Sequence, residues 1–207
     1  MFKNLKIGVK LGIGFGLMIV LLATVSMLAY LRVDSINGEI KDMVNDKFPK
    51  VVMANDAIDQ VNITARAIRN AMLVKSPEDV EKELARLSEA RKKTGEILEK
   101  LEKLITTEEG KKAFAKVMEA RKITVADQNE TVELAKAGKK DEAVHVLLTK
   151  VRKSQGDYLN AINDLIVFQT ELMTKSGKLA DELAGSTQRL VLIMAIAAIL
   201  IALAFGW

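Results

Sequence analysis

Two long runs without a charged residue lie near the two ends of this 207-residue chain, at residues 11–31 and 190–207. A helix rises about 1.5 Å per residue, so about 20 apolar residues cover the hydrocarbon core of a bilayer, which is about 30 Å thick. The sequence therefore predicts two transmembrane helices. A cytoplasmic N-terminus at residues 1–10 precedes the first span, and a polar domain at residues 32–189 separates the two.

Positive charges before the first run predict how the chain is oriented. Lys3, Lys6 and Lys10 precede that run, and positively charged flanks stay in the cytoplasm. Residues 32–189 are then outside, which in a bacterium is the periplasm, and the protein is a multi-pass protein of the inner membrane. A cleaved signal peptide is the alternative, but the run is longer than a usual signal core and offers no convincing cleavage site.

The composition excludes several function classes. The chain has no cysteine and one histidine, His145, so thiol chemistry, a multi-histidine zinc site and a Ser-His-Asp triad with a second base have no basis. Three of its 31 basic residues precede the first run, and the remaining 28 nearly balance the 27 acidic residues. A nucleic-acid binder needs a basic face. We therefore expect no cofactor, no metal, no enzymatic activity and no nucleic-acid partner.

Local signals divide residues 32–189 into four helices. Ser76 is predicted as an N-cap with Pro77 at the first helical position, Thr106 as an N-cap with Glu109 completing a capping box, and Gly138 as a helix end. The helices expected from these signals span about residues 32–74, 77–105, 107–137 and 140–189. Because the loops are short, the predicted fold is an all-α, antiparallel up-down-up-down four-helix bundle continuous with the two transmembrane helices.

Apolar residues recur at spacings of three and four along the first and last helices, as in coiled-coil packing. The first seam consists of Val51, Ala54, Ile58, Val61, Ala65, Ile68 and Met72. The last begins at Val144 and Leu148 and continues to Leu183, with Gln155 among its polar interruptions. Pro49 is predicted to kink the first helix, whereas the last is expected to have no strong break. A polar strip beside the first seam favours a second contact, so we expect a homodimer or a larger array.

That polar strip runs through Asn55, Asp59, Asn62, Arg66 and Arg69. One interpretation is a solvated edge whose arginine stems cover the seam. The other is an anion clamp, because guanidinium groups bind carboxylates through paired hydrogen bonds. The sequence by itself leaves both interpretations open.

A comparison of heights favours the clamp. Arg66 and Gln155 are equally far along the chain from their adjacent spans, and the third helix reaches the same height near Thr124. Arg121, Thr124 and Gln128 fall on inward positions there, where unpaired polar groups cost roughly 1–3 kcal/mol each. We therefore predict a polar pocket for a small organic acid or amino acid.

The stretch MFKNLKIGVKLGIGFGLMIVLLATVSMLAYL resembles the N-terminus of bacterial methyl-accepting chemotaxis proteins. The stretches ARAIRNAML and VELAKAGKKDEAVHVLL resemble their four-helix-bundle sensor domain. The resemblance covers the whole chain and implies a periplasmic chemoreceptor domain that signals through its fourth helix and second span. The ligand-binding positions that it implies are Arg66, Arg69, Gln155 and Tyr158, with Arg121, Thr124 and Gln128 where the pocket lies inside one bundle. Asn62, from the polar strip, is a further candidate ligand-binding residue.

Two departures limit what this resemblance implies. Amino-acid receptors of the group spread three arginines along the first helix, whereas this chain has two, so the ligand cannot be carried over. The sequence reaches Trp207 without a HAMP linker or signalling domain, so we expect either a fragment of a longer receptor or a receptor without its own output. Contact with a cytoplasmic chemotaxis kinase and adaptor is expected only through a missing C-terminal part. The alternatives are a two-span structural or tethering protein without a ligand, or the input domain of a sensor histidine kinase or cyclase.

Overall fold

The computed structural model describes residues 6–206, and the chain divides into two compact units. Unit 1 consists of Met1–Met43 and Thr174–Trp207, and unit 2 is Val44–Met173. Lys3, which the orientation prediction uses, and Trp207, which ends the predicted second span, lie outside the described residues.

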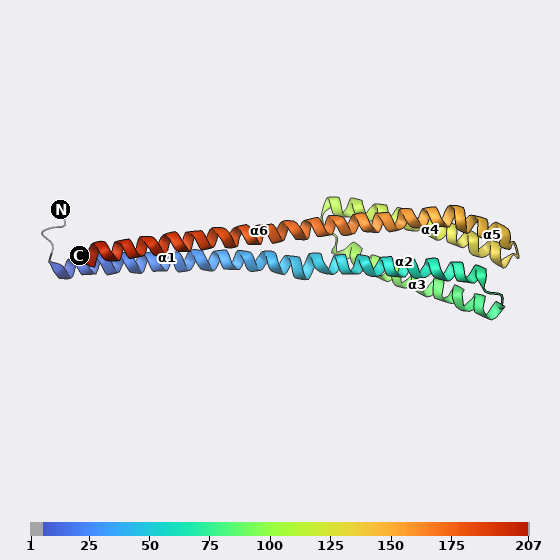
Figure 1. Cartoon of the computed structure of the whole chain (residues 1–207), viewed down its shortest axis with the longest axis horizontal. Helices are drawn as coiled ribbons and strands as arrows, with labels where there is room; N and C mark the ends of the chain where they lie inside the picture. The colour runs from blue at the N-terminus through green and yellow to red at the C-terminus, as the bar shows by residue number, and fades with distance from the viewer. Residues whose placement is uncertain (1–5, 207) are drawn as a thin grey trace. The chain divides into compact units, whose positions relative to one another are not determined.

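The described residues form helices and no strand, which confirms the all-α prediction (Figure 1). In chain order the elements are α1 (Ile7–Asp42), a π-helical segment η2 (Met43–Lys47), α2 (Phe48–Leu73), α3 (Pro77–Leu104), α4 (Glu108–Lys136), α5 (Lys140–Val146), a second π-helical segment η3 (Leu147–Val151) and α6 (Arg152–Gly206). The predicted helix limits at all three loops agree with the structure to within one residue.

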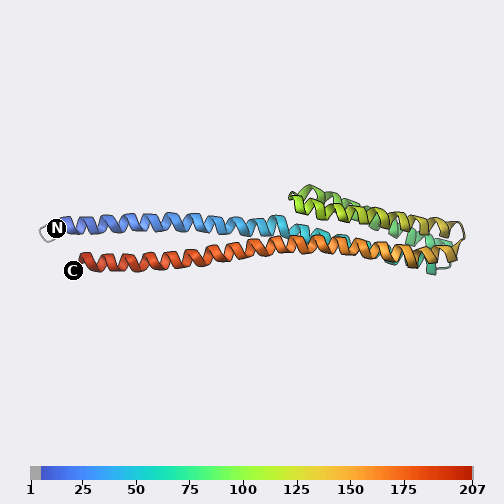
Figure 2. The ribbon, with the colours of Figure 1, turned by 90° about the horizontal axis from the view of Figure 1, so that it is seen from above.

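Unit 1 pairs α1 with the C-terminal part of α6, and Figures 1 and 2 both show these two segments side by side. A Cβ atom at Gly177 would lie 3.9 Å from the sulfur of Met43. Both helices are long and apolar enough to cross a membrane, with mean hydropathies of 2.3 and 2.1 in their most apolar windows. Only 6% and 0% of those windows is buried, unlike the core helix of a soluble protein.

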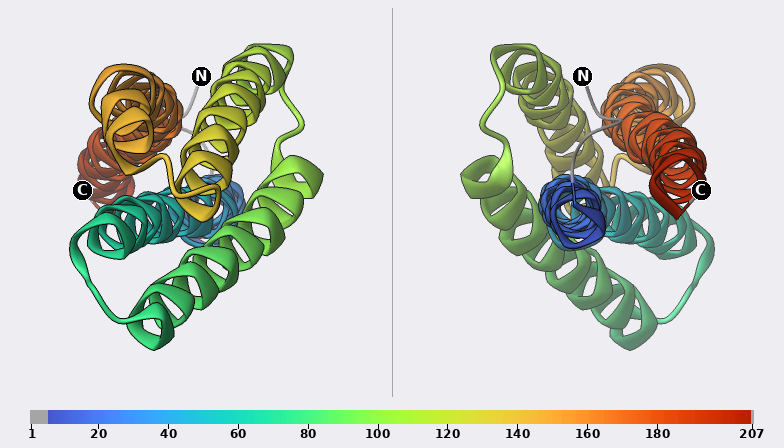
Figure 3. Two further views of the ribbon diagram at one scale, coloured as in Figure 1. Left: turned by 90° about the vertical axis from the view of Figure 1, so that its right-hand side faces the viewer. Right: turned by 90° about the vertical axis from the view of Figure 1, so that its left-hand side faces the viewer.

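Unit 2 is the four-helix bundle, in which α2, α3, α4 and the arm of α5, η3 and the start of α6 surround a common interior (Figure 3). Two predicted helix ends are confirmed. The hydroxyl of Ser76 accepts the backbone N–H of Asp79 at 3.4 Å at the start of α3. Gly138 has a φ of +75°, and the next N–H, that of Lys139, bonds to the carbonyl of Leu134 at 3.0 Å after α4.

The predicted N-cap at Thr106 is wrong by one residue. Thr107 is the N-cap of α4, and its hydroxyl accepts the backbone N–H of Gly110 at 3.1 Å. Ile105 is buried and still bonds back to the last turn of α3, so Thr106 belongs to the linker. Glu109 is then the second helical residue, and the predicted capping box does not form.

Two π-helical segments, η2 and η3, interrupt the α-helical geometry of the long helices. Pro49 has no N–H for the carbonyl of Asn45, which lies in η2, so the chain leaves α-geometry where the kink is predicted. The last helix continues from Lys140 to Leu203 without a strong break, as predicted, but η3 is a π-helical segment within it. Leu148 lies within η3, where the wider turn changes which way side chains point, and it is 59% exposed although the seam predicts it inside.

Three apolar clusters in unit 2 enclose a polar layer, with the larger cluster on one side of it and two smaller clusters on the other. The larger cluster includes Leu98, Val117 and Ile162, and the smaller ones are centred on Ile68 and Met72. Along each helix the polar residues fall between members of these clusters. The buried polar side chains in this layer are Thr64, Thr94, Thr124, Gln128, Thr131 and Ser154.

Candidate functional site

Arg91 and Gln128 form the centre of the polar layer. Arg91 donates from Nε and Nη2 to Oε1 of Gln128 at 3.0 and 2.8 Å, and from Nη1 to Oδ1 of Asn129 at 2.8 Å. The amide nitrogen of Gln128 donates to the hydroxyl of Thr64 at 3.3 Å. The network links α2, α3 and α4, and it satisfies an amide that is only 1% exposed.

Thr124 connects α4 to α6 within the same layer. Its hydroxyl lies 2.9 Å from the carbonyl oxygens of both Ala120 and Ser154, either of which it can donate to. Thr124 and Gln128 are both buried, as the spacing along the third predicted helix indicates. The layer therefore brings polar groups of all four bundle arms to one level.

Arg121 of α4 and Tyr158 of α6 add two further polar groups to this layer. Nη2 of Arg121 would lie 3.1 Å from a Cβ atom at Gly95, so the guanidinium approaches α3 where no side chain is present. Burial raises the pKa of Tyr158 to about 12, and the nearby charge of Arg121 opposes part of that rise. The pKa of Arg91 is lowered, first by burial and then by the charge of Arg121.

A separate groove of about 460 Å³ opens between α2 and the α5–η3–α6 arm. Its polar lining consists of Arg69 from α2 with Arg152 and Gln155 from α6. The remaining lining residues are apolar or glycine: Ala65, Leu147, Leu148, Val151, Gly156 and Leu159. Two guanidinium groups thus lie in an apolar groove whose lining contains no acidic residue.

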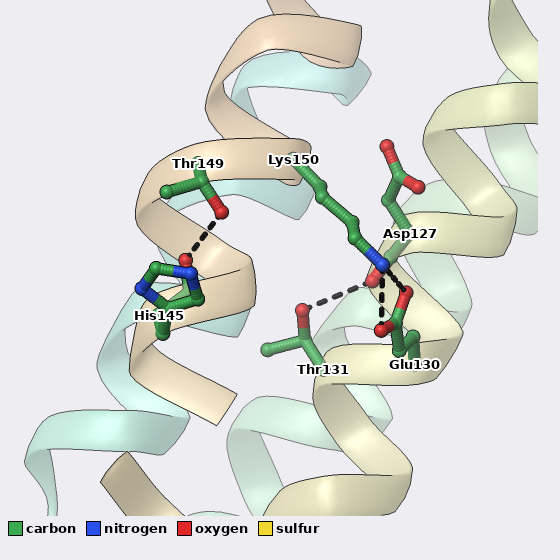
Figure 4. A network of polar contacts seen from close by, with 6 residues as sticks. All are labelled: Asp127, Glu130, Thr131, His145, Thr149 and Lys150. Atoms are coloured by element: carbon green, nitrogen blue, oxygen red, sulfur yellow. Dashed lines mark hydrogen bonds and ion pairs between the residues drawn. The ribbon is translucent and has the colours of Figure 1, made fainter. Parts of the chain in front are cut away.

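The two lysines that flank the groove residues Val151 and Arg152 in sequence are paired with carboxylates. Nζ of Lys150, in η3, lies 2.8 Å from both carboxylate oxygens of Glu130 in α4, and Figure 4 shows it pointing toward that carboxylate. Lys153 is paired with Asp157 at 2.7 Å. Neither Arg69 nor Arg152 has a hydrogen bond or ion pair with any residue that the structure describes. The groove is therefore positively charged and unneutralised.

Comparison with known proteins decides the family. A family model described as a four-helix-bundle sensory module for signal transduction matches residues 4–184. The chain belongs to this family. The match confirms the resemblance to the sensor region of methyl-accepting chemotaxis proteins. A search of curated proteins found no match.

The sensory module separates the predicted site residues into three groups. Arg69 and Gln155 line the groove. The interior layer holds Arg121, Thr124, Gln128 and Tyr158. Asn62 is half-buried and Arg66 is exposed, and neither lines the groove. Three residues turn a helix by about 300°, so Arg66 points about 60° away from Arg69. Residues that the sequence analysis assigned to one pocket, from their equal distance to the membrane spans, thus lie in two separate sites, the groove and the interior layer.

Sequence reasoning missed Arg91 and Arg152 as site residues. Arg91 and Thr94 interrupt an apolar seam that runs from Leu87 to Leu98 at spacings of four, three and four. A polar residue within an apolar seam is also what identified Gln155 in the last predicted helix. The same inspection of the second predicted helix would have found Arg91. Arg152 directly follows the seam residue Val151. The direction of its side chain depends on the π-helical geometry of η3, and no residue type in the sequence predicts that geometry.

Proposed function

We propose that this sensory module is the periplasmic sensor region of a bacterial transmembrane chemoreceptor and binds a small organic acid or amino acid in the α2–α6 groove. One observation carries the proposal: Arg69, Arg152 and Gln155 line an apolar groove without an acidic residue. A ligand carboxylate supplies the missing acceptors, and each charge-assisted hydrogen bond contributes about 1.5–3 kcal/mol.

The groove also offers a basis for selecting among acids. Its volume of about 460 Å³ falls in the usual range for small-molecule sites. Leu148 and Leu159 would contact the apolar part of the ligand, and Gln155 would donate to or accept from its remaining polar group. We infer that the module acts by binding alone, with no catalytic step.

The signal would pass along α6. The groove takes Leu147, Leu148 and Val151 from η3, and Arg152 and Gln155 from the first turns of α6. The same helix continues to Gly206 and includes the second candidate membrane span. If α6 can occupy two alternative positions, a ligand that binds one of these conformations more tightly than the other shifts the equilibrium between them. We infer a homodimer in the inner membrane, with unit 2 in the periplasm.

Calorimetric titration of the full chain in detergent tests the groove. The panel is small mono- and dicarboxylates and amino acids, with neutral sugars for comparison. For any acid that binds, Arg69→Ala and Arg152→Ala should each weaken affinity at least tenfold, because each removes a paired hydrogen-bonding group. Arg66→Ala removes the same charge from the same helix outside the groove and should change affinity less than twofold.

Two results would overturn the proposal. One is an acid whose affinity neither Arg69→Ala nor Arg152→Ala alters. The other is the absence of binding by every acid in the panel, which would favour a structural or tethering role for the bundle.

A further inference from the structure

Arg189 is the last charged residue of α6 before the apolar C-terminal part of that helix. It lines a pocket of about 360 Å³ together with Ser186, Leu190, Ile193 and Met194. These positions fall on successive turns of α6, so the five side chains lie on one face of the helix. The pocket therefore has a polar end, at Ser186 and Arg189, and an apolar end that begins one turn further along the helix.

The polar end carries a positive charge that no described residue neutralises. Arg189 makes no hydrogen bond or ion pair with any residue that the structure describes. From Leu183 onward, α6 contains no aspartate or glutamate. The hydroxyl of Ser186 donates to the carbonyl of Leu183 at 3.0 Å, which leaves its oxygen able to accept. This end thus offers a free guanidinium and one hydroxyl acceptor.

The apolar end belongs to the part of α6 that is apolar enough to cross a membrane. None of the most apolar window of this helix is buried, and Ile193 is 65% exposed. Arg189 directly precedes the second uncharged run, just as Arg32 directly follows the first. With the two runs in a bilayer, both guanidinium groups lie at its outer border, where arginine side chains extend toward the lipid headgroups.

We propose that this face of α6 binds an anionic phospholipid, with the phosphate at Arg189 and an acyl chain along Ile193 and Met194. A guanidinium binds a phosphate through paired hydrogen bonds. Ser186 accepts from a hydroxyl of the headgroup. The inference rests on the membrane placement in the proposed function and is independent of the groove and its ligand, because none of these residues lines the groove.

The two ends of the pocket favour a lipid over other occupants. A free phosphate or a soluble acid fills only the polar end and leaves the apolar end empty. A second copy of the chain in the same orientation brings its own Arg189 to the same level, where like charges repel. A phospholipid matches both the charge at the membrane border and the apolar surface beside it.

Native mass spectrometry of the full chain in detergent, titrated with phosphatidylglycerol or with phosphatidylcholine of the same acyl chains, tests the proposal. Phosphatidylglycerol should bind saturably and at least fivefold more tightly, because the choline group cancels the phosphate charge of the other lipid. Arg189→Gln should weaken phosphatidylglycerol binding at least fivefold. Arg32→Gln removes the same charge at the border of the other span, outside the pocket, and should change binding less than twofold.

Further variants test the apolar end and separate this site from the groove. Ile193→Ala should weaken phosphatidylglycerol binding at least twofold, whereas Ile199→Ala removes a similarly exposed isoleucine outside the pocket and should not. Glycerol phosphate, a headgroup without acyl chains, should not compete. Arg69→Ala alters the groove and should leave lipid binding unchanged, so the two proposals can fail separately. Circular dichroism verifies that each variant is folded.

Several results would overturn the lipid site. They are equal affinities for the two lipids, unchanged binding in Arg189→Gln, an equal loss in Arg32→Gln, equal effects of the two isoleucine changes, and competition by glycerol phosphate. The last result would assign a soluble phosphate instead of a lipid.

Discussion

Tyr158 shows how one residue can report on a whole layer. Its ring packs in the larger apolar cluster, but its hydroxyl is buried with no partner among the described residues. An unsatisfied buried hydroxyl costs about 1–3 kcal/mol. We therefore expect Tyr158→Phe to raise the free energy of unfolding by about 1 kcal/mol. Chemical denaturation of the two proteins at neutral pH measures this difference, and a clear loss of stability in the variant would contradict it.

The same residue predicts a loss of stability in base. Its pKa rises from 10.0 to about 12 in the folded protein, chiefly through burial. Folding then favours the protonated hydroxyl, so this contribution is fully present below pH 10 and is lost as the pH rises toward 12. A shift of this size corresponds to roughly 2–3 kcal/mol. Tyr158→Phe should lack this component, whereas the exposed Tyr30→Phe should keep it.

Denaturation midpoints measured between about pH 9 and pH 12 separate the two cases. Lysine titration and weakened ion pairs affect all three proteins alike, so only the difference between them reports on Tyr158. Parallel loss of stability in wild type and Tyr158→Phe would show that the hydroxyl ionises as easily in the folded protein as in the unfolded one.

At the scale of the element, the helix ends are where local sequence and structure can be compared most directly. Thr107 accepts the N–H of Gly110, while Thr106 lies in the linker. We expect Thr107→Ala to lower the free energy of unfolding by about 1 kcal/mol, because an N-cap acceptor is lost. Thr106→Ala is the matched control and should change it by less than about half as much. Thermal unfolding of both variants measures the difference, and a larger effect at Thr106 would restore the cap predicted from sequence.

The fold was predictable where residues act locally. Ser76, Pro77 and Gly138 each mark a helix end by their own chemistry, and the structure confirms those ends. The choice between Thr106 and Thr107 was not predictable, because adjacent threonines offer the same cap and the packing of Ile105 decides. The second π-helical segment has no local marker either, and it changes which side of the arm faces inward.

The candidate site was predictable in part for the same reason. The inward positions of Thr124 and Gln128 follow from spacing along one helix. The partition between groove and interior depends on how helices rotate against each other, so Arg66 and Arg69 separate although they are three residues apart. Arg91 could have been found from the sequence, because it is a polar residue within the apolar seam from Leu87 to Leu98. Finding it requires that every predicted helix be inspected for such residues.

At the scale of the whole molecule, α6 is the element that belongs to both compact units. It begins at Arg152 beside the groove, and its residues from Thr174 onward belong to unit 1. In the proposed function, α6 would carry the effect of ligand binding in unit 2 to unit 1. Binding energy in the groove would act on the first turns of α6, where Arg152 and Gln155 are located.

The most direct test of the claim that ligand binding in unit 2 moves α6 in unit 1 is the rate of crosslinking in unit 1, measured as ligand is added. Met43→Cys and Gly177→Cys place two thiols on facing helices, and the chain has no native cysteine. We expect saturating carboxylate ligand to change the rate of oxidative crosslinking at least threefold, with half the effect at the dissociation constant measured by calorimetry. Arg152→Ala should abolish the change at that concentration. An unchanged rate with the groove saturated would contradict the account.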